Sequence, residues 1–328
     1  MKKIFTLFIL LVLTLTLTSC TTKTVNKVYA KEGAKTIAIL KYGTHTSLDE
    51  IEEGIVNEIK KNSSDLVIKT YDCNFDSAII NQTLTAIKDL DLACIVAIAT
   101  PVAVAACNTF TDIPVVFAAV SDPVSANVVG ANVTGTSDQM QLDLLIDLAK
   151  EVDSNAKTFG YIYTETEANS NANLVTLKDL AKSKNFTLKT KTITQTYEIT
   201  DNLNSLIDQG IDSLIVTDDN NVAAGMDILS DICARNNIGV YCAADSEVRD
   251  GGMMGYSISY SKLAEYTGQQ VLEIVKDRKA VSEVPVKYFN QQSDLNLYFN
   301  SDFLKKSSKY NTLVNETIKS KGTDLSKR

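Results

Sequence analysis

The stretch Leu92–Pro123, LACIVAIATPVAVAACNTFTDIPVVFAAVSDP, decides the fold of this chain. Two of its segments, Leu92–Ala99 and Pro114–Ala119, are apolar at nearly every position, and the helix-like segment Pro101–Phe110 lies between them. Continuously apolar strands are typical of parallel sheets that helices cover on both faces. Parallel neighbours are joined through such helices. The stretch therefore predicts a βαβ unit within an α/β fold.

The alternation of strands and helices extends from this unit toward the N-terminus. We expect strands at Thr36–Lys41 and Leu66–Tyr71, and helices at Ser47–Lys61 and Asp76–Leu90. Several βαβ units in series predict one parallel sheet for this half of the chain.

The same series recurs in the second half. Three later segments repeat earlier ones in order: Thr158–Tyr163 repeats Thr36–Lys41, Ile211–Asp219 repeats Leu92–Thr100, and Ile238–Ala244 repeats Ile113–Ala119. About 55 residues separate the first two markers in each half. Coincidence among strands rich in Ile, Val and Ala is the alternative. The recurrence predicts two Rossmann-like lobes of like topology, each with a parallel sheet.

The C-terminal part departs from this series. It contains strand-like segments at Gly252–Tyr260, Lys287–Asn290 and Asp294–Asn300, and an amphipathic helix at Lys262–Arg278. A tail of this length can return to the first lobe and then to the second. We expect one lobe from residues 36–135 and 260–285, and the other from residues 136–259 and 286–328. Crossings near Thr136, Ser259 and Pro285 would then form a hinge.

The N-terminus has the features of an export signal. Lys2 and Lys3 precede an apolar run, Ile4–Leu17, of 14 residues, which is shorter than the ~20 residues of a membrane-spanning helix and fits the apolar region of a signal peptide. The following Leu-Thr-Ser-Cys ends at Cys20 and resembles a bacterial lipobox. We expect removal of residues 1–19, a lipid on Cys20, and a flexible spacer over residues 20–35. An ordinary signal peptide or a weak anchor helix is the alternative.

Composition excludes several classes of function. Without Lys2 and Lys3, 30 basic residues face 40 acidic ones, a formal charge near −10, so nucleic acid is not an expected partner. Beyond Cys20 the cysteines are odd in number and form no C-x-x-C pair, and His45 is the only histidine, so we expect no disulfide framework and no metal site. Nucleotide and hydrolase motifs are missing from the sequence. We therefore expect neither an enzyme nor a cofactor.

Candidate ligand-binding residues follow the strands of the first half, because ligands of open parallel sheets bind beyond the carboxyl ends of the strands. Tyr42 and His45 follow the first strand. Thr100 and Pro101 have the pattern of a helix start, with Thr as cap and Pro as first helical residue, where free N–H groups accept a carboxylate. Ser121 offers a second donor. A plain helix cap is the alternative for Thr100, and packing is the alternative for Tyr42.

The second half offers carboxylates at the equivalent places. Asp219 and Asp245 end two strands, where charge-assisted hydrogen bonds could hold an ammonium group. Capping of the next helix is the alternative for both. Tyr163 could stack on a flat side chain or simply fill space. A carboxylate-binding lobe that faces an ammonium-binding lobe describes a site for an amino acid.

Eight stretches carry a family resemblance: Tyr42–Asp49 (YGTHTSLD), Val96–Pro101 (VAIATP), Ile113–Pro123 (IPVVFAAVSDP), Asn132–Asp138 (NVTGTSD), Glu167–Ser170 (EANS), Asp219-Asn220, Ala244-Asp245 and Gly251–Tyr260. With them the chain resembles the substrate-binding lipoproteins of ABC transporters of the tryptophan/tyrosine-binding type, which have the type I periplasmic-binding-protein fold. The resemblance implies an aromatic amino acid in the cleft between the lobes, an ABC permease as partner, and a monomer anchored by lipid at the outer face of the cell membrane.

The resemblance also implies roles for single residues. Thr100 and Ser121 match the carboxylate-binding strand ends of the family. Its second-lobe loop corresponds to Glu167, Asn169 and Ser170, and its acidic strand ends to Asp219 and Asp245. The chain departs from the family in having Asp218 before Asp219, where a neutral residue is usual, and Ala244 before Asp245, where a serine is frequent.

The choice of ligand depends on the far end of the pocket. Polar groups expected there are those of His45, Asp138, Glu167 and Asn169, and they favour a ring with a hydroxyl group, because a buried partner left unpaired is costly. Tyrosine is thus expected ahead of tryptophan, with phenylalanine or another amino acid left open. The rival function is that of a surface adhesin or interaction lipoprotein, and both functions can coexist.

Overall fold

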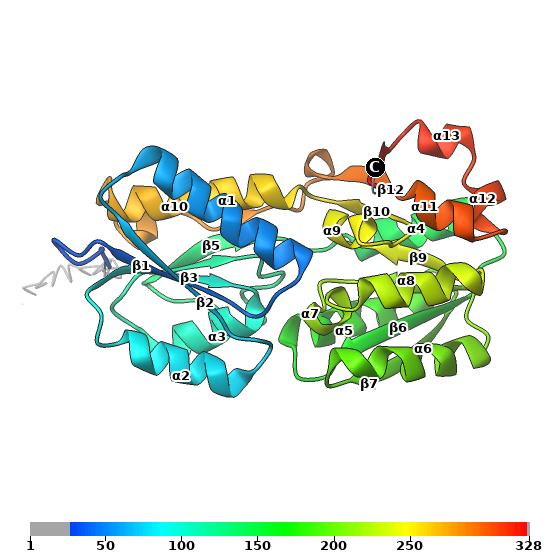
Figure 1. The fold of residues 1–328 in the computed structure, drawn as a ribbon, viewed down its shortest axis with the longest axis horizontal. Helices are drawn as coiled ribbons and strands as arrows, with labels where there is room; N and C mark the ends of the chain where they lie inside the picture. Colours follow the sequence, from blue (N-terminus) through cyan, green and yellow to red (C-terminus); the bar gives the residue numbers. More distant parts are fainter. Residues whose placement is uncertain (1–26, 327–328) are drawn as a thin grey trace, which may run out of the picture.

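The computed structural model describes residues 27–326, which form two α/β lobes side by side along the long axis of the molecule (Figure 1). The expected signal peptide, the lipidation site Cys20 and the first part of the spacer lie outside the described residues.

The first lobe contains a six-stranded sheet in the order β11-β5-β4-β3-β1-β2, and every neighbouring pair is parallel. Its strands are β1 (Thr36–Lys41), β2 (Val67–Asp72), β3 (Leu92–Ile98), β4 (Val115–Ala118), β5 (Val133–Ser137) and β11 (Lys287–Tyr288). Its helices are α1 (Thr46–Asn62), α2 (Ser77–Ile87), α3 (Thr100–Thr109) and α10 (Tyr260–Val275), with a short 3₁₀ turn η2 (Val281–Glu283). Helices α1 and α10 pack together on one face of the sheet, and α2 and α3 on the other (Figure 1).

The second lobe contains a seven-stranded sheet in the order β13-β12-β10-β9-β8-β6-β7, in which only the β10–β12 pair is antiparallel. Its strands are β6 (Thr158–Thr164), β7 (Thr187–Ile193), β8 (Ser213–Val216), β9 (Gly239–Cys242), β10 (Met254–Ser257), β12 (Asn296–Phe299) and β13 (Thr323–Asp324). Its helices are α4 (Leu142–Val152), α5 (Ala168–Ser183), α6 (Ile199–Asp208), α7 (Asn220–Ala223), α8 (Met226–Arg235), α9 (Asp245–Arg249), α11 (Ser301–Lys306), α12 (Tyr310–Leu313) and α13 (Glu316–Lys319), with the 3₁₀ turns η1 (Thr196–Glu198) and η3 (Gln292–Asp294).

The two sheets have the same strand topology. The order β2-β1-β3-β4-β5 in the first lobe corresponds to β7-β6-β8-β9-β10 in the second. The expected tandem lobes of like topology are therefore confirmed. In both, the carboxyl ends of the central strands face the cleft between the lobes, where a ligand of such a sheet binds.

Each lobe has its own hydrophobic core. All of β3 and β4 is buried, because helices cover both faces of the sheet. The edge strand β2 alternates between half-buried and exposed residues. This contrast explains why the central strands gave the stronger sequence signal.

Within residues 27–326 the chain crosses between the lobes three times; the first and third crossings come somewhat later than expected, and the second lies at Ser259 as expected. The crossings are residues 138–141, 258–259 and 289–295. Thr136 was expected to begin the second lobe, but it lies in β5 and its hydroxyl pairs with that of Thr267 at 2.7 Å. Strand β11 was also expected in the second lobe, yet it pairs with β5 in the first. The short β11 adds an edge to the first sheet before the chain leaves.

The described part of the expected spacer packs on the first lobe. Ala30 and Ala34 are buried in the first core, and the N–H of Val281 donates to the carbonyl of Val28 at 2.9 Å. Residues 27–35 thus pack on the first lobe, because their few apolar side chains find a place there.

The cysteines beyond Cys20 are free thiols, and all but Cys107 are buried. Burial raises the pKa of the Cys94 thiol to about 12, so it is a poor nucleophile. Among residues 27–326, no helix combines the length and the apolar content that a bilayer crossing requires.

Candidate functional site

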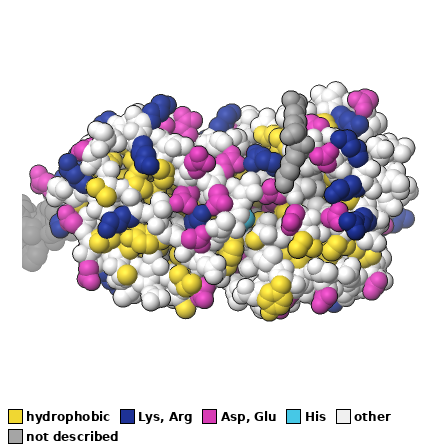
Figure 2. All heavy atoms as spheres, in the orientation of Figure 1, with side chains coloured by type: hydrophobic (Ala, Val, Ile, Leu, Met, Phe, Trp, Pro, Cys, Tyr) yellow, Lys and Arg dark blue, Asp and Glu magenta, His cyan; other side chains and the backbone are white. Residues whose placement is uncertain are grey.

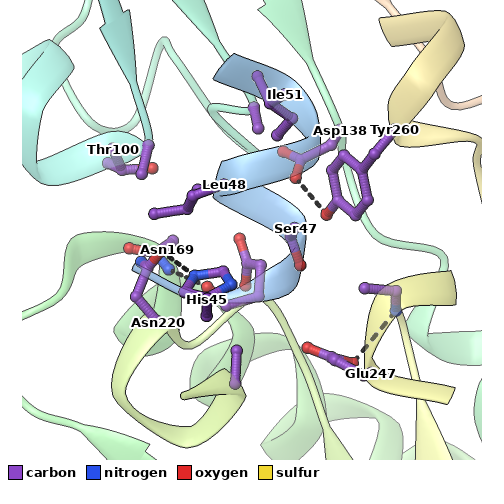
Figure 3. Close-up of a pocket in the computed structure, with 15 residues that line it drawn as sticks. His45, Ser47, Leu48, Ile51, Thr100, Asp138, Asn169, Asn220, Glu247 and Tyr260 are labelled. Carbon is purple, nitrogen blue, oxygen red and sulfur yellow. Dashed lines mark hydrogen bonds between the residues drawn. The ribbon is translucent and has the colours of Figure 1, made fainter. Parts of the chain in front are cut away.

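A pocket lies between the lobes at the carboxyl ends of both sheets (Figure 3). The space in it that a water molecule can enter is about 20 Å³, well below the ~300–1,000 Å³ of open small-molecule sites. The first lobe contributes His45, Ser47, Leu48, Ile51, Ala99, Thr100, Ala119, Asp138 and Tyr260; the second contributes Asn169, Asp218, Asn220, Ala223, Ala244 and Glu247.

The start of α1 forms one wall of the pocket. Leu48 and Ile51 are one helical turn apart and therefore share a face, which Figure 3 shows turned toward the pocket. His45 caps the helix by position, and its Nε2 lies 3.2 Å from Oδ1 of Asn220 in the other lobe. Its ring stacks parallel on Phe75 at 6.2 Å. Burial lowers the pKa of His45, so the imidazole is neutral.

The start of α3 forms a second wall. Ala99 and Ala119, which directly follow β3 and β4, adopt φ values of 75° and 53°, which non-glycine residues rarely take and which cluster at ligand sites. The cap position is Ala99, so Thr100 and Pro101 each lie one residue deeper in the helix than expected. No side chain caps α3, and its first-turn N–H groups can donate hydrogen bonds to an anionic group.

Three carboxyl groups form an acidic part of the pocket lining. Asp138 accepts a hydrogen bond from the Tyr260 hydroxyl at 2.9 Å, and Glu247 accepts one from the N–H of Ala244 at 3.2 Å (Figure 3). Asp218 accepts from the hydroxyl of Ser121 and from Asn173 at 2.5 Å. Among the described residues that line the pocket there is no lysine or arginine.

The electrostatics of this acidic part favour a cation. Burial, and secondly the charge of Asp138, raises the pKa of Asp218 to about 7. Burial also raises the pKa of Asp138 and of Glu247. Figure 2 shows acidic side chains gathered on the visible face where the lobes meet. A ligand with an ammonium group would compensate these carboxylates.

Asp219, expected to hold the ammonium group, does not line the pocket. Its fully buried carboxylate accepts from the N–H and hydroxyl of Thr164 at 2.5 and 2.9 Å, from Ser170 at 2.7 Å and from the N–H of Val222 at 3.0 Å. It caps α7 and joins β6, α5 and α7. The capping alternative therefore describes Asp219, and Ser170 belongs to the same support.

Glu167 acts on the pocket through its neighbours. It is fully buried and accepts from Nδ2 of Asn220 at 2.5 Å and from Nδ2 of Asn221 at 3.3 Å. This fixes the Asn220 amide whose oxygen faces His45. Asn169 does line the pocket: its Nδ2 donates to the Asp218 carbonyl at 2.8 Å, while its buried Oδ1 has no hydrogen-bond partner.

Asp245 and the two tyrosines also lie outside the lining. Asp245 pairs with Arg249 at 3.1 Å, and the pocket instead contains its neighbour Ala244. Tyr42 packs edge-on against Phe75 at 5.4 Å in the first core. The ring of Tyr163 stacks on that of Tyr161 at a centroid distance of 5.4 Å, which agrees with the alternative that Tyr163 packs against its neighbours.

Ser121 borders an adjoining cavity of about 230 Å³ that shares Thr100 and Asn169 with the pocket. Of the expected residues, His45, Thr100, Asp138 and Asn169 thus line the pocket itself, and Ser121 reaches its rim.

Sequence reasoning missed five lining residues, which are Ser47, Leu48, Ile51, Glu247 and Tyr260. It named Asp218 and Asn220 only as neighbours of Asp219 at a strand end, and chose Asp219 as the ligand contact. Asn220 and Asp218 flank Asp219. The rule that ligands bind beyond the carboxyl ends of parallel strands therefore located the correct loop, but not which of its side chains enters the pocket. The helix face of α1 could have been found by spacing. Tyr260 could not, because it comes from a later crossing.

The comparison with known families decides the class of protein. A family model described as ABC transporter substrate binding protein matches residues 36–322. The chain belongs to the family of ABC transporter substrate-binding proteins. Its type I periplasmic-binding-protein fold is thereby confirmed, and proteins of this family are extracytoplasmic.

Individual relatives are consistent with this assignment. The substrate-binding chain is 31% identical over 294 residues to a tyrosine-binding protein of Clostridioides difficile, covering 85% of this chain and 83% of that one. It is similar to the ligand-free, open structure of a substrate-binding protein with adhesive properties from Clostridium difficile (31% identity, TM-score 0.62, 90% and 100% of the chains). An ABC domain from Streptococcus pneumoniae in complex with L-Trp shares the fold (24% identity, TM-score 0.78, 88% and 99%).

Proposed function

We propose that this substrate-binding protein captures an aromatic amino acid, tyrosine ahead of tryptophan, and passes it unchanged to an ABC permease. The observation that carries the proposal is the mixed lining of the pocket, which contains the carboxyl groups of Asp138, Asp218 and Glu247 and the uncapped start of α3. A zwitterion supplies an ammonium group to the carboxyl groups and a carboxylate to the helix start. The name of the C. difficile relative supports the aromatic class.

The ammonium contacts proposed here differ from those expected from the sequence. Asp218 and Asp138 replace Asp219 and Asp245, because only the former pair lines the pocket. The hydroxyl of a tyrosine ring would find acceptors in Oδ1 of Asn169, which has no partner, or in the His45–Asn220 pair. Phenylalanine would leave such a group unpaired, and this favours tyrosine.

Delivery would follow closure of the lobes around the ligand. Contacts already cross the cleft: the hydroxyls of Ser47 and Ser246 lie 2.5 Å apart, and Arg249 pairs with Glu50 at 3.1 Å. The relative solved in an open form aligns over its whole length with a TM-score of only 0.62. A closed arrangement here and an open one there are what a hinged receptor requires.

We further propose that a lipid on Cys20 holds the protein, as a monomer, at the outer face of the cell membrane. An adhesin function is the second candidate, because a relative at 31% identity is described as having adhesive properties. Pocket substitutions separate the two functions, since they would abolish amino-acid binding and leave attachment to a surface unchanged.

Calorimetric titration of the processed chain with tyrosine, tryptophan and phenylalanine tests the proposal. Micromolar or tighter binding of tyrosine, at least tenfold tighter than phenylalanine, is expected. The chain contains no tryptophan, so indole emission from a purified sample reports bound ligand alone. Binding of none of the three amino acids would overturn the proposed function.

A further inference from the structure

One hydroxyl group connects two carboxyl groups from opposite lobes. The Ser121 hydroxyl lies 3.2 Å from Oδ1 of Asp138, at the end of β5, and also contacts Oδ2 of Asp218, at the end of β8. The second oxygen of each carboxyl group already accepts a hydrogen bond: Tyr260 donates to Oδ2 of Asp138, and Asn173 donates to Oδ1 of Asp218. The two acids therefore meet across the cleft through a single side chain.

The two contacts of Ser121 with Asp138 and Asp218 need two protons, and the serine hydroxyl supplies only one. A serine hydroxyl has one proton and can donate it to only one of the two carboxylates. The other contact is a hydrogen bond only if that carboxyl group carries a proton and donates it to Ser121. Two ionised carboxylates at this distance would repel each other in a medium of low dielectric constant.

The surrounding groups do not supply a positive charge. The titratable side chains whose charge interacts with Asp218 include Asp138 from the first lobe, Asp219 beside it, Glu247 on α9, Tyr260 on α10, and Tyr161 on β6. Each is acidic or phenolic. His45 at the start of α1 lines the same pocket, and burial lowers its pKa, which favours the neutral imidazole. Among residues 27–326, no group of His, Cys, Asp and Glu is arranged to hold a metal ion that would neutralise the pair. The pKa of Asp218, raised to about 7 by burial and by Asp138, agrees with a retained proton.

An ammonium group in the pocket would change this balance. It has three N–H donors and one positive charge, and both Asp138 and Asp218 line the pocket. It can donate to both carboxylates while Ser121 keeps its own proton. The proton of the pair is then no longer needed and leaves to solvent.

We propose that the ligand's ammonium group binds by replacing one proton on the Asp138–Asp218 pair, so that Asp218 makes a primary ammonium group a requirement of the site. This inference rests on the proposed function and adds the chemical step by which the ligand is recognised. Charge balances: one ammonium enters and one proton leaves. Amino acids bind with proton release below neutral pH, and analogues without the ammonium group bind with the proton kept.

Proton release is measured by titrating tyrosine at pH 6 and pH 8 in buffers of different ionisation enthalpy. About one proton released at pH 6 and almost none at pH 8 is expected. The dissociation constant rises up to ~10-fold for each unit that the pH falls below about 7. The des-amino analogue 3-(4-hydroxyphenyl)propionate has the opposite dependence and binds better at pH 6 than at pH 8.

Substitutions assign the proton to this pair. Asp218→Asn leaves a neutral group that can accept from Asn173 and donate to Ser121, so it preserves the contacts while proton release disappears and tyrosine binding weakens. Asp179→Asn, on the exposed side of α5, is the matched control and keeps proton release at its original value.

The outcomes distinguish this inference from the proposed function. Tight binding of tyrosine at pH 6 without any dependence on buffer would overturn the proton exchange and leave the proposed function intact. Unchanged proton release in Asp218→Asn would also overturn it. Absence of binding for tyrosine, tryptophan and phenylalanine at both pH values would overturn both.

Discussion

Asp218 and Asp219 are adjacent residues with different environments. Asp219 is fully buried under four donors from three elements, whereas Asp218 points into the cleft and contacts the other lobe. At the end of a strand, successive side chains leave on opposite sides. Asp219 therefore stabilises the second lobe, while its neighbour Asp218 is placed to contact the ligand.

Asp219→Ala is expected to destabilise the protein by roughly 3 kcal/mol, because buried donors from Thr164, Ser170 and Val222 would lose their acceptor. Urea unfolding measures the loss. Asp179→Ala, which removes an exposed carboxylate, should change the free energy of unfolding by less than about 0.5 kcal/mol. A stable Asp219→Ala protein that no longer binds tyrosine would instead make Asp219 a direct ligand contact.

Asp218→Asn is expected to change the pH dependence of stability in the ligand-free protein. The pKa of Asp218 is about 7 in the folded state against a model value of 3.8. Its contribution to stability is thus complete below about 3.8 and is lost as the pH rises through about 7. The variant should melt roughly 2–4 °C higher than the parent at pH 8, equivalent to about 1 kcal/mol. The gain should be smaller at pH 5 and vanish only near pH 3.8; equal melting differences at pH 5 and pH 8 would contradict this assignment.

At the scale of elements, α1 both holds the first lobe together and reaches into the pocket. Its contact with α10 is close because each helix presents a glycine to the other. A Cβ on Gly54 would lie 2.6 Å from that of Ala264, and one on Gly268 would lie 2.8 Å from that of Glu58. The helix that carries His45 and Leu48 is thereby fixed against α10, the helix that carries Tyr260.

Gly54→Val is expected to cost about 1–3 kcal/mol of stability through overpacking of the α1–α10 contact, and to weaken ligand binding by shifting the pocket wall. Thermal unfolding and calorimetry measure the two effects. Asn57→Val places the same residue on the exposed side of α1 and should leave binding unchanged. Equal effects of the two substitutions would show that helix propensity, not close packing, is responsible.

The α1–α9 contact is expected to favour the closed arrangement of the lobes. Arg249 on α9 pairs with Glu50 on α1, and both side chains are partly exposed. Glu50→Gln should therefore raise the dissociation constant for tyrosine only about 2- to 5-fold, through faster release, since such pairs contribute up to about 1 kcal/mol. Stopped-flow dissociation checks this. Lys182→Gln, which breaks an exposed pair on α5, is the control; a slower association with unchanged release would argue against a role in closure.

At the scale of the whole molecule, three crossings connect two lobes with separate cores. Separate cores allow the lobes to rotate as rigid bodies, and the crossings absorb the change in backbone angles. Small-angle scattering should therefore give a smaller radius of gyration with saturating tyrosine than without it. An unchanged profile, with binding verified by calorimetry on the same sample, would contradict hinge closure.

Local pattern determined most of the fold. Apolar runs such as Leu92–Ala99, which recur in the same order, predicted two parallel sheets and nearly every strand. A central strand is buried on both faces, so nearly every one of its side chains is apolar. The rule of strand ends likewise located His45, Thr100 and the loop around Asp218, since the carboxyl ends of parallel strands share one edge.

Tertiary structure decided which side chains enter the pocket and where the lobes divide. Asp218 and Asp219 carry the same carboxyl group in adjacent positions, so no local pattern separates the one that contacts Ser121 from the one that caps α7. Tyr260 reaches the pocket only because the tail returns to the first lobe. The sequence alone therefore determined the family and the architecture, which depend on local periodicity and order. The identity of the ligand contacts and the proton held between two lobes depend on pairings between residues far apart in the sequence, such as Ser121 with Asp218 and His45 with Asn220, and only the folded chain brings those together.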